Sequence, residues 1–173
     1  MTLSMHQASV PVLVRALSNL REVLRKGEAH AVAAGYDPAL LLQMRIAPDM
    51  FPLLRQVQIA TDMAKNACAR LAGVEPLAFA DDEASFDELY ARLDRAIDYI
   101  GGFTAQQLDG SEGREITLQT RNDGELKFDG RSYLLHYVLP NVLFHCTTSY
   151  ALLRGAGVTI GKKDFLGPAR KPA

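Results

Sequence analysis

His145 is the residue best placed to do chemistry, because it interrupts an apolar pattern. It takes the place of an apolar residue in the three-four repeat over 138–152, so its side chain is expected to face a helical core. Asn141 lies one turn earlier on the same face, and Gln56 lies beside the apolar seam over 50–71. Facing helices of bundles often build sites from inward side chains, so these three residues predict a polar pocket or a metal site. The alternative is a core histidine hydrogen-bonded to a neighbouring amide or carbonyl.

Three further residues are candidates for the same pocket. Arg45 and Asp49 lie in the connection that leads into segment 50–71. Arg45 could bind an anionic group near a helix N-terminus. In the structural alternative, Asp49 caps the helix and Arg45 is its salt-bridge partner. Tyr150 belongs to a helical stripe of tyrosines, a pattern typical of a core or an interface.

The other histidines and the two cysteines form no recognised metal motif. The sequence contains no HxxxH, HExxH or CxxC pair, and no P-loop or GxGxxG. His6 and His30 are expected at the surface, and His136 could donate to a backbone carbonyl. Cys68 and Cys146 fall in apolar-periodic segments and are expected to be reduced, half-buried thiols.

The elements that must position these residues are four amphipathic helices. Apolar residues recur at spacings of three and four, the period of helices that pack at shallow angles. The four seams lie over 10–24, 50–71, 86–100 and 138–152. Residues 4–7 and 85–88 have the form of capping boxes. The chain is therefore predicted to be all-α: an antiparallel up-and-down four-helix bundle in one domain over 1–173, with an extended tail over 158–173.

Two prolines modify these helices. Pro11 lies early in the first helix, which is expected to become regular only around Ser9. Pro140 lies inside the fourth helix, where it removes a hydrogen bond and should bend the helix near His136.

Period-two patterning indicates a β-hairpin between the third and fourth helices. Ile116 and Leu118 alternate with polar residues, as do Leu126 and Phe128 after the turn residues 122–124. An Asp-Gly turn between two such runs is typical of a hairpin. We expect it to lie over one end of the bundle.

Composition excludes several classes of function. The protein has 173 residues, 48% apolar and 23% charged, and a net charge of −1. It offers no basic face to nucleic acid and no apolar run of membrane-spanning length. The one basic cluster, at Lys162, Lys163, Arg170 and Lys171, is expected on a solvated tail. With no leader pattern at its start, the protein is expected to be cytoplasmic.

Motifs along nearly the whole chain resemble a known family. They are Arg-Ile-Ala-Pro-Asp-Met-Phe-Pro-Leu at 45–53, Leu-Pro-Asn at 139–141, Phe-His at 144–145 and the tail over 153–167. Together they are similar to the domain-of-unknown-function family numbered 1993, which is related to the DinB/YfiT-like four-helix-bundle superfamily. The resemblance implies an up-and-down bundle that is commonly a homodimer.

The resemblance also implies a possible metal centre. Relatives in the wider superfamily include metal-dependent thiol transferases with three inward histidines. The last of these corresponds to His145, and the other two fall at Asn141 and near Gln56. Carboxamides are poor ligands for zinc or nickel, so the resemblance implies a degenerate metal site with His145 as its one remaining ligand.

Two interpretations of function remain open, and with them whether the protein is an enzyme. In the first, it is a metal-free homodimer without a cofactor, which binds a small molecule at the polar pocket or uses this cluster to specify packing. In the second, it is a metal- or thiol-dependent transferase or hydrolase of the DinB/YfiT type. His145 would then be a ligand to zinc or nickel, or a general base. Neither interpretation involves nucleic acid or a membrane.

Overall fold

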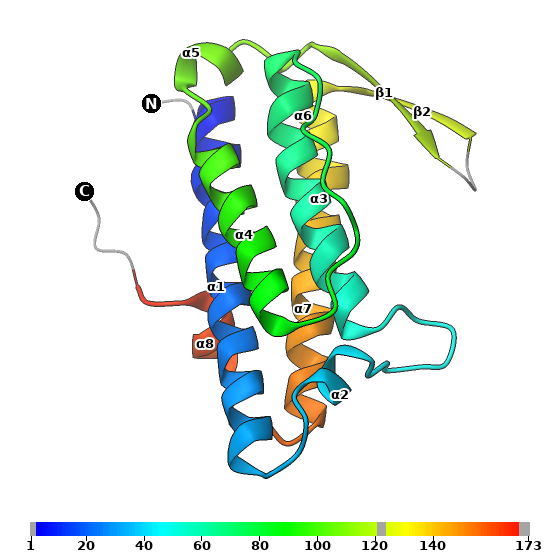
Figure 1. The fold of residues 1–173 in the computed structure, drawn as a ribbon. Helices are drawn as coiled ribbons and strands as arrows, with labels where there is room; N and C mark the ends of the chain where they lie inside the picture. The colour runs from blue at the N-terminus through cyan, green and yellow to red at the C-terminus, as the bar shows by residue number, and fades with distance from the viewer. Residues whose placement is uncertain (1–2, 121–123, 170–173) are drawn as a thin grey trace.

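The computed structural model describes residues 3–120 and 124–169, and its main feature is a bundle of four long helices (Figure 1). α1 packs against α4 and α7, and α3 packs against the same two helices. The four are α1 (Met5–Ala33), α3 (Leu53–Ala72), α4 (Phe86–Gly101) and α7 (Leu139–Gly155). A short helix, α2 (Ala39–Leu42), follows α1. The four-helix prediction is confirmed.

The helix directions differ from the expected up-and-down order. Segment 73–85 returns along the length of the bundle before α4 begins, so α3 and α4 run in the same direction, opposite to α1 and α7 (Figure 1). Side-chain contacts agree, because Arg92, in the first half of α4, binds Thr61, in the first half of α3. At the other end, His6 of α1 contacts the carbonyl of Phe103, just beyond α4. A long linker makes this parallel neighbour pair possible.

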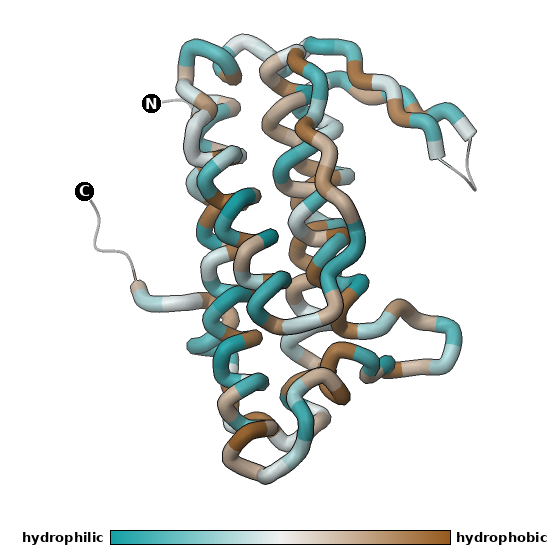
Figure 2. The backbone as a smooth tube through the Cα atoms, viewed as in Figure 1, coloured by the Kyte–Doolittle hydropathy of each residue, from teal (hydrophilic) through white to brown (hydrophobic). Residues whose placement is uncertain are grey.

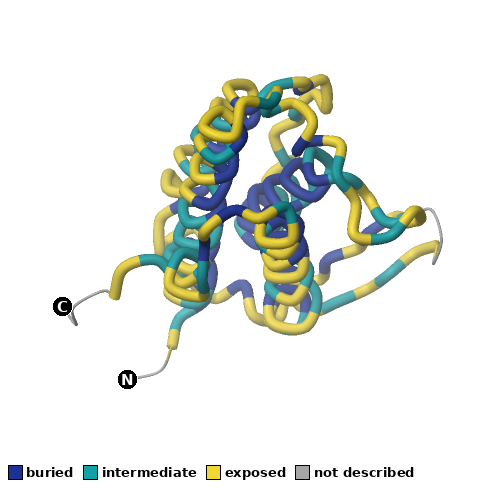
Figure 3. The backbone as a smooth tube through the Cα atoms, turned by 90° about the horizontal axis from the view of Figure 1, so that it is seen from below, coloured by how far each residue is buried: buried dark blue, intermediate teal, exposed yellow. Residues whose placement is uncertain are grey.

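The core is formed by the predicted seams. Hydrophobic positions recur along each long helix (Figure 2), and the buried positions line the inward sides of the helices (Figure 3). Leu17 of α1, Val57 of α3, Leu93 of α4 and Val142 of α7 are at most 1% exposed. Removing these surfaces from water is the main force that holds the bundle together.

Two predictions about helix starts are confirmed by the structure, and two are wrong. Both capping boxes form, at Ser4 and at Ser85. α1 begins at Met5 rather than near Ser9, because Pro11 removes only one hydrogen bond from a helix whose first turn is already capped. Asp49 does not cap α3, whose N-cap is Pro52 in an extended conformation. A residue before proline is biased away from helical angles, which keeps the helix from starting earlier.

The irregularity predicted around His136 takes the form of a π-helix. α6 (Gly130–Ser132) leads into the π-helix η1 (Tyr133–Val138), which continues into α7. Pro140 has no N–H for the carbonyl of His136, four residues earlier, so the regular hydrogen-bond ladder is interrupted there.

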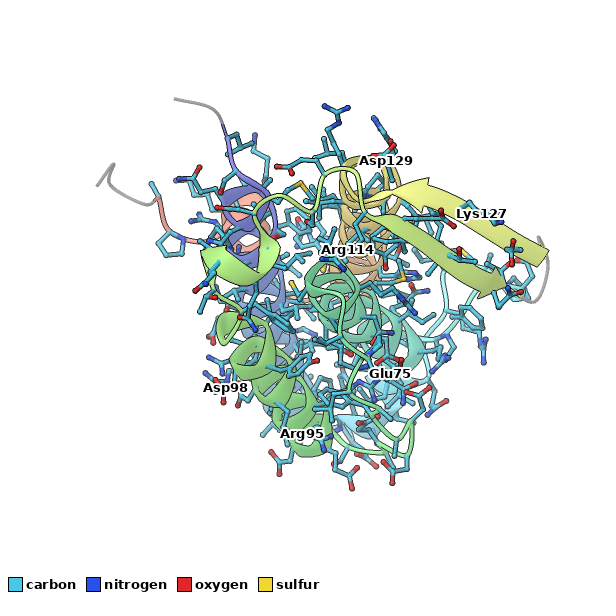
Figure 4. All side chains as sticks on the ribbon, turned by 90° about the horizontal axis from the view of Figure 1, so that it is seen from above. Glu75, Arg95, Asp98, Arg114, Lys127 and Asp129 are labelled. Atoms are coloured by element: carbon cyan, nitrogen blue, oxygen red, sulfur yellow. The ribbon has the colours of Figure 1, made fainter. Side chains whose placement is uncertain are left out.

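The predicted hairpin is confirmed. β1 (Glu115–Thr120) pairs antiparallel with β2 (Gly124–Asp129), and Ile116 lies opposite Phe128. Its turn residues Asn122 and Asp123 lie outside the described residues. The hairpin follows α5 (Ala105–Leu108) and projects sideways from one end of the bundle instead of lying across it (Figures 1 and 4).

The C-terminal segment is more ordered than an extended tail. Val158 and Ile160 are buried, and residues Lys162–Leu166 form the short helix α8, which packs against α1. Burial of these apolar side chains is the reason for the difference. Lys162 and Lys163 are exposed, as expected, while Arg170 and Lys171 lie outside the described residues. Across the described ranges, no helix combines the length and apolar character needed to cross a membrane.

Candidate functional site

His145 and Gln56 meet in the interior of the bundle. The Nδ1 of His145, on α7, lies 2.7 Å from the Oε1 of Gln56, on α3. His145 is 8% exposed and Gln56 is 2% exposed. The heptad seams bring these two positions to the α3–α7 contact, which places a polar pair within an otherwise apolar interface.

The backbone of Phe51 fixes the orientation of the Gln56 amide. The Nε2 of Gln56 donates to the carbonyl oxygen of Phe51 at 3.0 Å, so its Oε1 must face His145. An amide oxygen only accepts hydrogen bonds, and therefore His145 donates through Nδ1. The remaining ring nitrogen, Nε2, then carries the lone pair when the ring is neutral.

Burial keeps His145 neutral. Desolvation lowers the pKa of His145 to about 4, and the positive charge of Arg55 adds to this effect. At pH 7 the ring is therefore an uncharged imidazole with its proton on Nδ1. Its Nε2 has no hydrogen-bond partner among the described residues and retains contact with solvent.

The ring of one phenylalanine packs against His145, and the backbone of another holds Gln56. The ring of Phe144 lies edge-on to the imidazole, with a centroid distance of 5.2 Å. Phe51 supplies the carbonyl that holds Gln56. Both side chains are more than half exposed. The imidazole of His145 therefore packs against an exposed aromatic ring, that of Phe144.

The other predicted pocket residues make different contacts. The Nδ2 of Asn141 donates to the carbonyl of Tyr137 at 2.6 Å, within its own helix. Arg45 donates to the carbonyl of Met50 at 2.7 Å and forms no ion pair with Asp49. The ring of Tyr150 packs against Phe165 of α8. Of the six candidates, all of which lie in the described residues, only His145 and Gln56 are joined by a hydrogen bond.

The donor set does not fit a three-ligand metal centre. His145 can offer one nitrogen, while the amides at Gln56 and Asn141 are already committed to hydrogen bonds with protein groups. Residues 3–120 and 124–169 contain no group of three or more His, Cys, Asp or Glu side chains that could hold a metal ion. Structural and catalytic zinc sites use at least three protein ligands.

The cysteines are not activated thiols. Cys68 and Cys146 are both free and fully buried, rather than half-buried as expected. Desolvation raises the pKa of each to about 12. A thiolate, the nucleophilic form, is therefore strongly disfavoured at neutral pH.

Sequence reasoning missed a buried charged cluster around Arg92. The Arg92 side chain has no exposed surface, yet it lies on α4 with its guanidinium among acidic groups. Its Nη1 is 3.0 Å from Glu83, and its Nη2 is 2.9 Å from Asp62 and 3.0 Å from Asp81. Its Nε donates to Thr61 at 2.7 Å. This network attaches the 73–85 linker to α3 and α4.

A signal for Arg92 was present in the sequence. It lies three residues after Leu89 and four before Ala96, a spacing that places it on the buried face of its helix. Acidic residues at Asp81 and Glu83 shortly precede this helix. A lone cation on an apolar face, preceded by carboxylates, indicates a buried ion pair.

A cavity of about 660 Å³ lies beside this network, between the linker and the base of the hairpin. Its basic side chains are Lys65, Arg70 and Arg114, and it is lined by as many carboxylates. Arg114 lies over the end of α3 (Figure 4), where Gly73 leaves room for its guanidinium. Because the charges are balanced, the cavity shows no preference for a ligand of one sign.

Comparison with known proteins agrees with this architecture. The chain is similar to a solved structure of a DinB family member protein from Shewanella denitrificans, with 34% identity and a TM-score of 0.86. The match covers 97% of this chain and 94% of that one. No curated protein matches the chain. The domain of unknown function DUF1993 matches residues 5–166. The chain therefore belongs to the DUF1993 family and has a DinB-like fold.

Proposed function

We propose that this protein binds a small molecule at His145 without a metal. The observation that carries the proposal is the fixed tautomer: Gln56 holds the proton on Nδ1, which leaves Nε2 as a hydrogen-bond acceptor with no partner among the described residues. A ligand with a hydroxyl or amide N–H could donate to Nε2. The ring of Phe144 offers apolar contact beside the imidazole.

The lowered pKa favours binding over proton transfer. A general base works best when its pKa is near the working pH, and burial holds the pKa of His145 at about 4. Such an imidazole is always neutral at pH 7 but is a weak base. The second candidate function is that of a transferase or hydrolase that uses His145 as the general base. The observation in its favour is that Nε2 of His145 has no hydrogen-bond partner among the described residues.

Homodimerisation is also part of this proposal. Phe51 is 54% exposed and Phe144 is 55% exposed. Exposed aromatic residues are enriched in protein interfaces. Light scattering should give the mass of two chains, and Phe144→Ser should shift it toward one. A mass of one chain for the wild type at tens of micromolar would reject the dimer.

Nuclear magnetic resonance with small probes tests the binding site. Phenol and benzamide, which carry donors, should shift the His145 Nε2 resonance, whereas toluene should have a much smaller effect. Backbone amide resonances next to residue 145 should also respond to phenol in the wild type, and this response should disappear in His145→Phe, which keeps an aromatic ring. Equal responses to phenol and toluene would reject a hydrogen-bonding site.

Elemental analysis tests the metal-free part of the proposal. Protein purified without a histidine tag should stay metal-free after incubation with zinc or nickel and desalting. Stoichiometric metal that is lost in a folded His145→Ala variant would contradict the proposal and favour the enzymatic candidate.

A further inference from the structure

A second cavity lies on another side of α7 from His145. It has a volume of about 340 Å³ and is lined by residues of α1, α7 and α8. His145 faces α3, while the next residue, Cys146, lies about 100° further around the helix and lines this cavity. Leu20 and Val23 of α1 are its other buried walls. The volume is within the range of small-molecule sites.

The cavity wall formed by α8 is held in place by specific hydrogen bonds. The Nδ2 of Asn19 donates to the carbonyl of Phe165 at 3.0 Å. Arg15 donates to the carbonyl of Leu166 and, at 2.7 Å, to that of Pro168. An ion pair between Lys26 and Asp164 adds a further link. Figure 1 shows α8 lying alongside α1.

The surface of the cavity is apolar apart from its two polar α1 residues. Val12, Ala16, Leu143 and Phe165 provide hydrocarbon walls. Val12 and Leu143 are at least 40% exposed, so these walls are open to solvent on one side. A hydrocarbon group entering the cavity would remove both surfaces from water, which is favourable.

Arg15 provides a positive charge at this apolar cavity. In the described part of the chain no carboxylate lies within ion-pair distance of its guanidinium, whose contacts are backbone carbonyls. Its Nη1 makes no hydrogen bond to a described residue. An arginine with a free donor and no acidic partner is suited to binding a carboxylate.

We propose that this cavity binds a small anionic amphiphile, with its hydrocarbon chain between α1, α7 and α8 and its carboxylate at Arg15. Both parts of the ligand are matched by observed groups: apolar walls and an unpaired cation. The proposal is independent of the function proposed at His145, because the two sites share no residue.

Calorimetric titration with octanoate tests this proposal, with octan-1-ol and octylammonium as probes of equal chain length. Octanoate should bind about tenfold or more tighter than octanol, since hydrogen bonds to charged groups contribute more than neutral ones. Octylammonium should bind more weakly than octanol. Equal affinities for all three, or no octanoate binding at millimolar concentration, would overturn the proposal.

Variants of Arg15 locate the head group. Arg15→Gln should bring the ratio of octanoate affinity to octanol affinity close to one, and Arg15→Lys should retain part of the preference. Arg25→Gln is the matched control, because Arg25 is an exposed arginine of the same helix that does not line the cavity. If the preference survives in folded Arg15→Gln, the carboxylate does not bind there.

Variants that fill the cavity test where the hydrocarbon chain of the ligand binds. Ala16→Phe should abolish binding of both octanoate and octanol. Leu143→Trp is a second filling variant at an exposed position, and it introduces a tryptophan into a chain that has none. Unchanged octanoate affinity in either folded variant would overturn the proposal. A second pair of results would also overturn it: the wild type is a dimer that Leu143→Trp dissociates, and octanoate does not bind. A second copy of the chain would then cover the cavity.

Discussion

His145 donates a hydrogen bond to Gln56 across 2.7 Å, and this contact joins two helices that are far apart in the sequence. Gln56 is itself held by the carbonyl of Phe51, so the proton position on the imidazole depends on a backbone group of a loop. The contact accounts for a buried polar pair without a buried charge. It also makes the protonation state of His145 the most direct test of the site.

The first prediction concerns the pH dependence of stability. The pKa of His145 is about 4 in the folded chain and near 6.5 when unfolded, so the unfolded state binds one more proton between these values. The free energy of unfolding should therefore fall by about 3 kcal/mol as the pH drops from 7 to 4. Urea unfolding gives the free energy of unfolding of the wild type and of His145→Gln at several pH values. The contribution of His145 is the difference between the two slopes of this free energy against pH. Equal slopes, or a folded-state titration near pH 6.5, would contradict it.

The second prediction concerns Gln56. Gln56→Leu leaves the His145 Nδ1–H and the Phe51 carbonyl without partners, which should cost about 1–3 kcal/mol in urea unfolding. Gln56→Glu should instead raise the pKa of His145, because a carboxylate next to Nδ1 stabilises the imidazolium. Gln119→Leu on the exposed strand β1 is the control, with an expected change within about 0.5 kcal/mol. An unchanged pKa in Gln56→Glu would mean that the pair is not formed in solution.

The third prediction concerns the buried ion network. Arg92→Met removes a fully buried guanidinium and leaves Glu83, only 4% exposed, with Arg95 at 3.9 Å as its remaining cation. The free energy of unfolding should fall by about 3–5 kcal/mol. Arg95→Met is the comparison on the same helix: Arg95 is 60% exposed and approaches Glu83 only to 3.9 Å, so its change should stay within about 1 kcal/mol. Adding Glu83→Gln to Arg92→Met should recover part of the loss, and failure to recover any would argue against coupling of the two charges.

The fourth prediction concerns Gly130, where the hairpin joins α6. A Cβ at this position would overlap the carbonyl oxygen of Ser111, so Gly130→Ala should destabilise the protein by about 1–3 kcal/mol. Gly155→Ala, in the last turn of α7, meets nothing within 4 Å and should be neutral or stabilising by up to about 1 kcal/mol. Thermal unfolding of both variants provides the comparison. A stable Gly130→Ala would mean that the hairpin can shift away from the bundle end.

Local patterns in the sequence determined much of this protein. The three-four spacing predicted the four helices, the capping boxes predicted their starts at Ser4 and Ser85, and alternation predicted the hairpin. These signals depend on neighbours within a few residues, since helix and strand periods are local. The inward orientation of His145 followed from the same periodicity.

Tertiary structure decided the features that depend on distant partners. The linker 73–85 reverses the direction expected for α4, and Arg92 is buried because carboxylates of that linker and of α3 surround it. Asn141 was predicted to join His145 but bonds within its own helix, while Gln56 reaches it across the bundle. Periodicity shows which face of a helix is buried, but the choice of polar partner depends on the three-dimensional positions of groups that are remote in the chain.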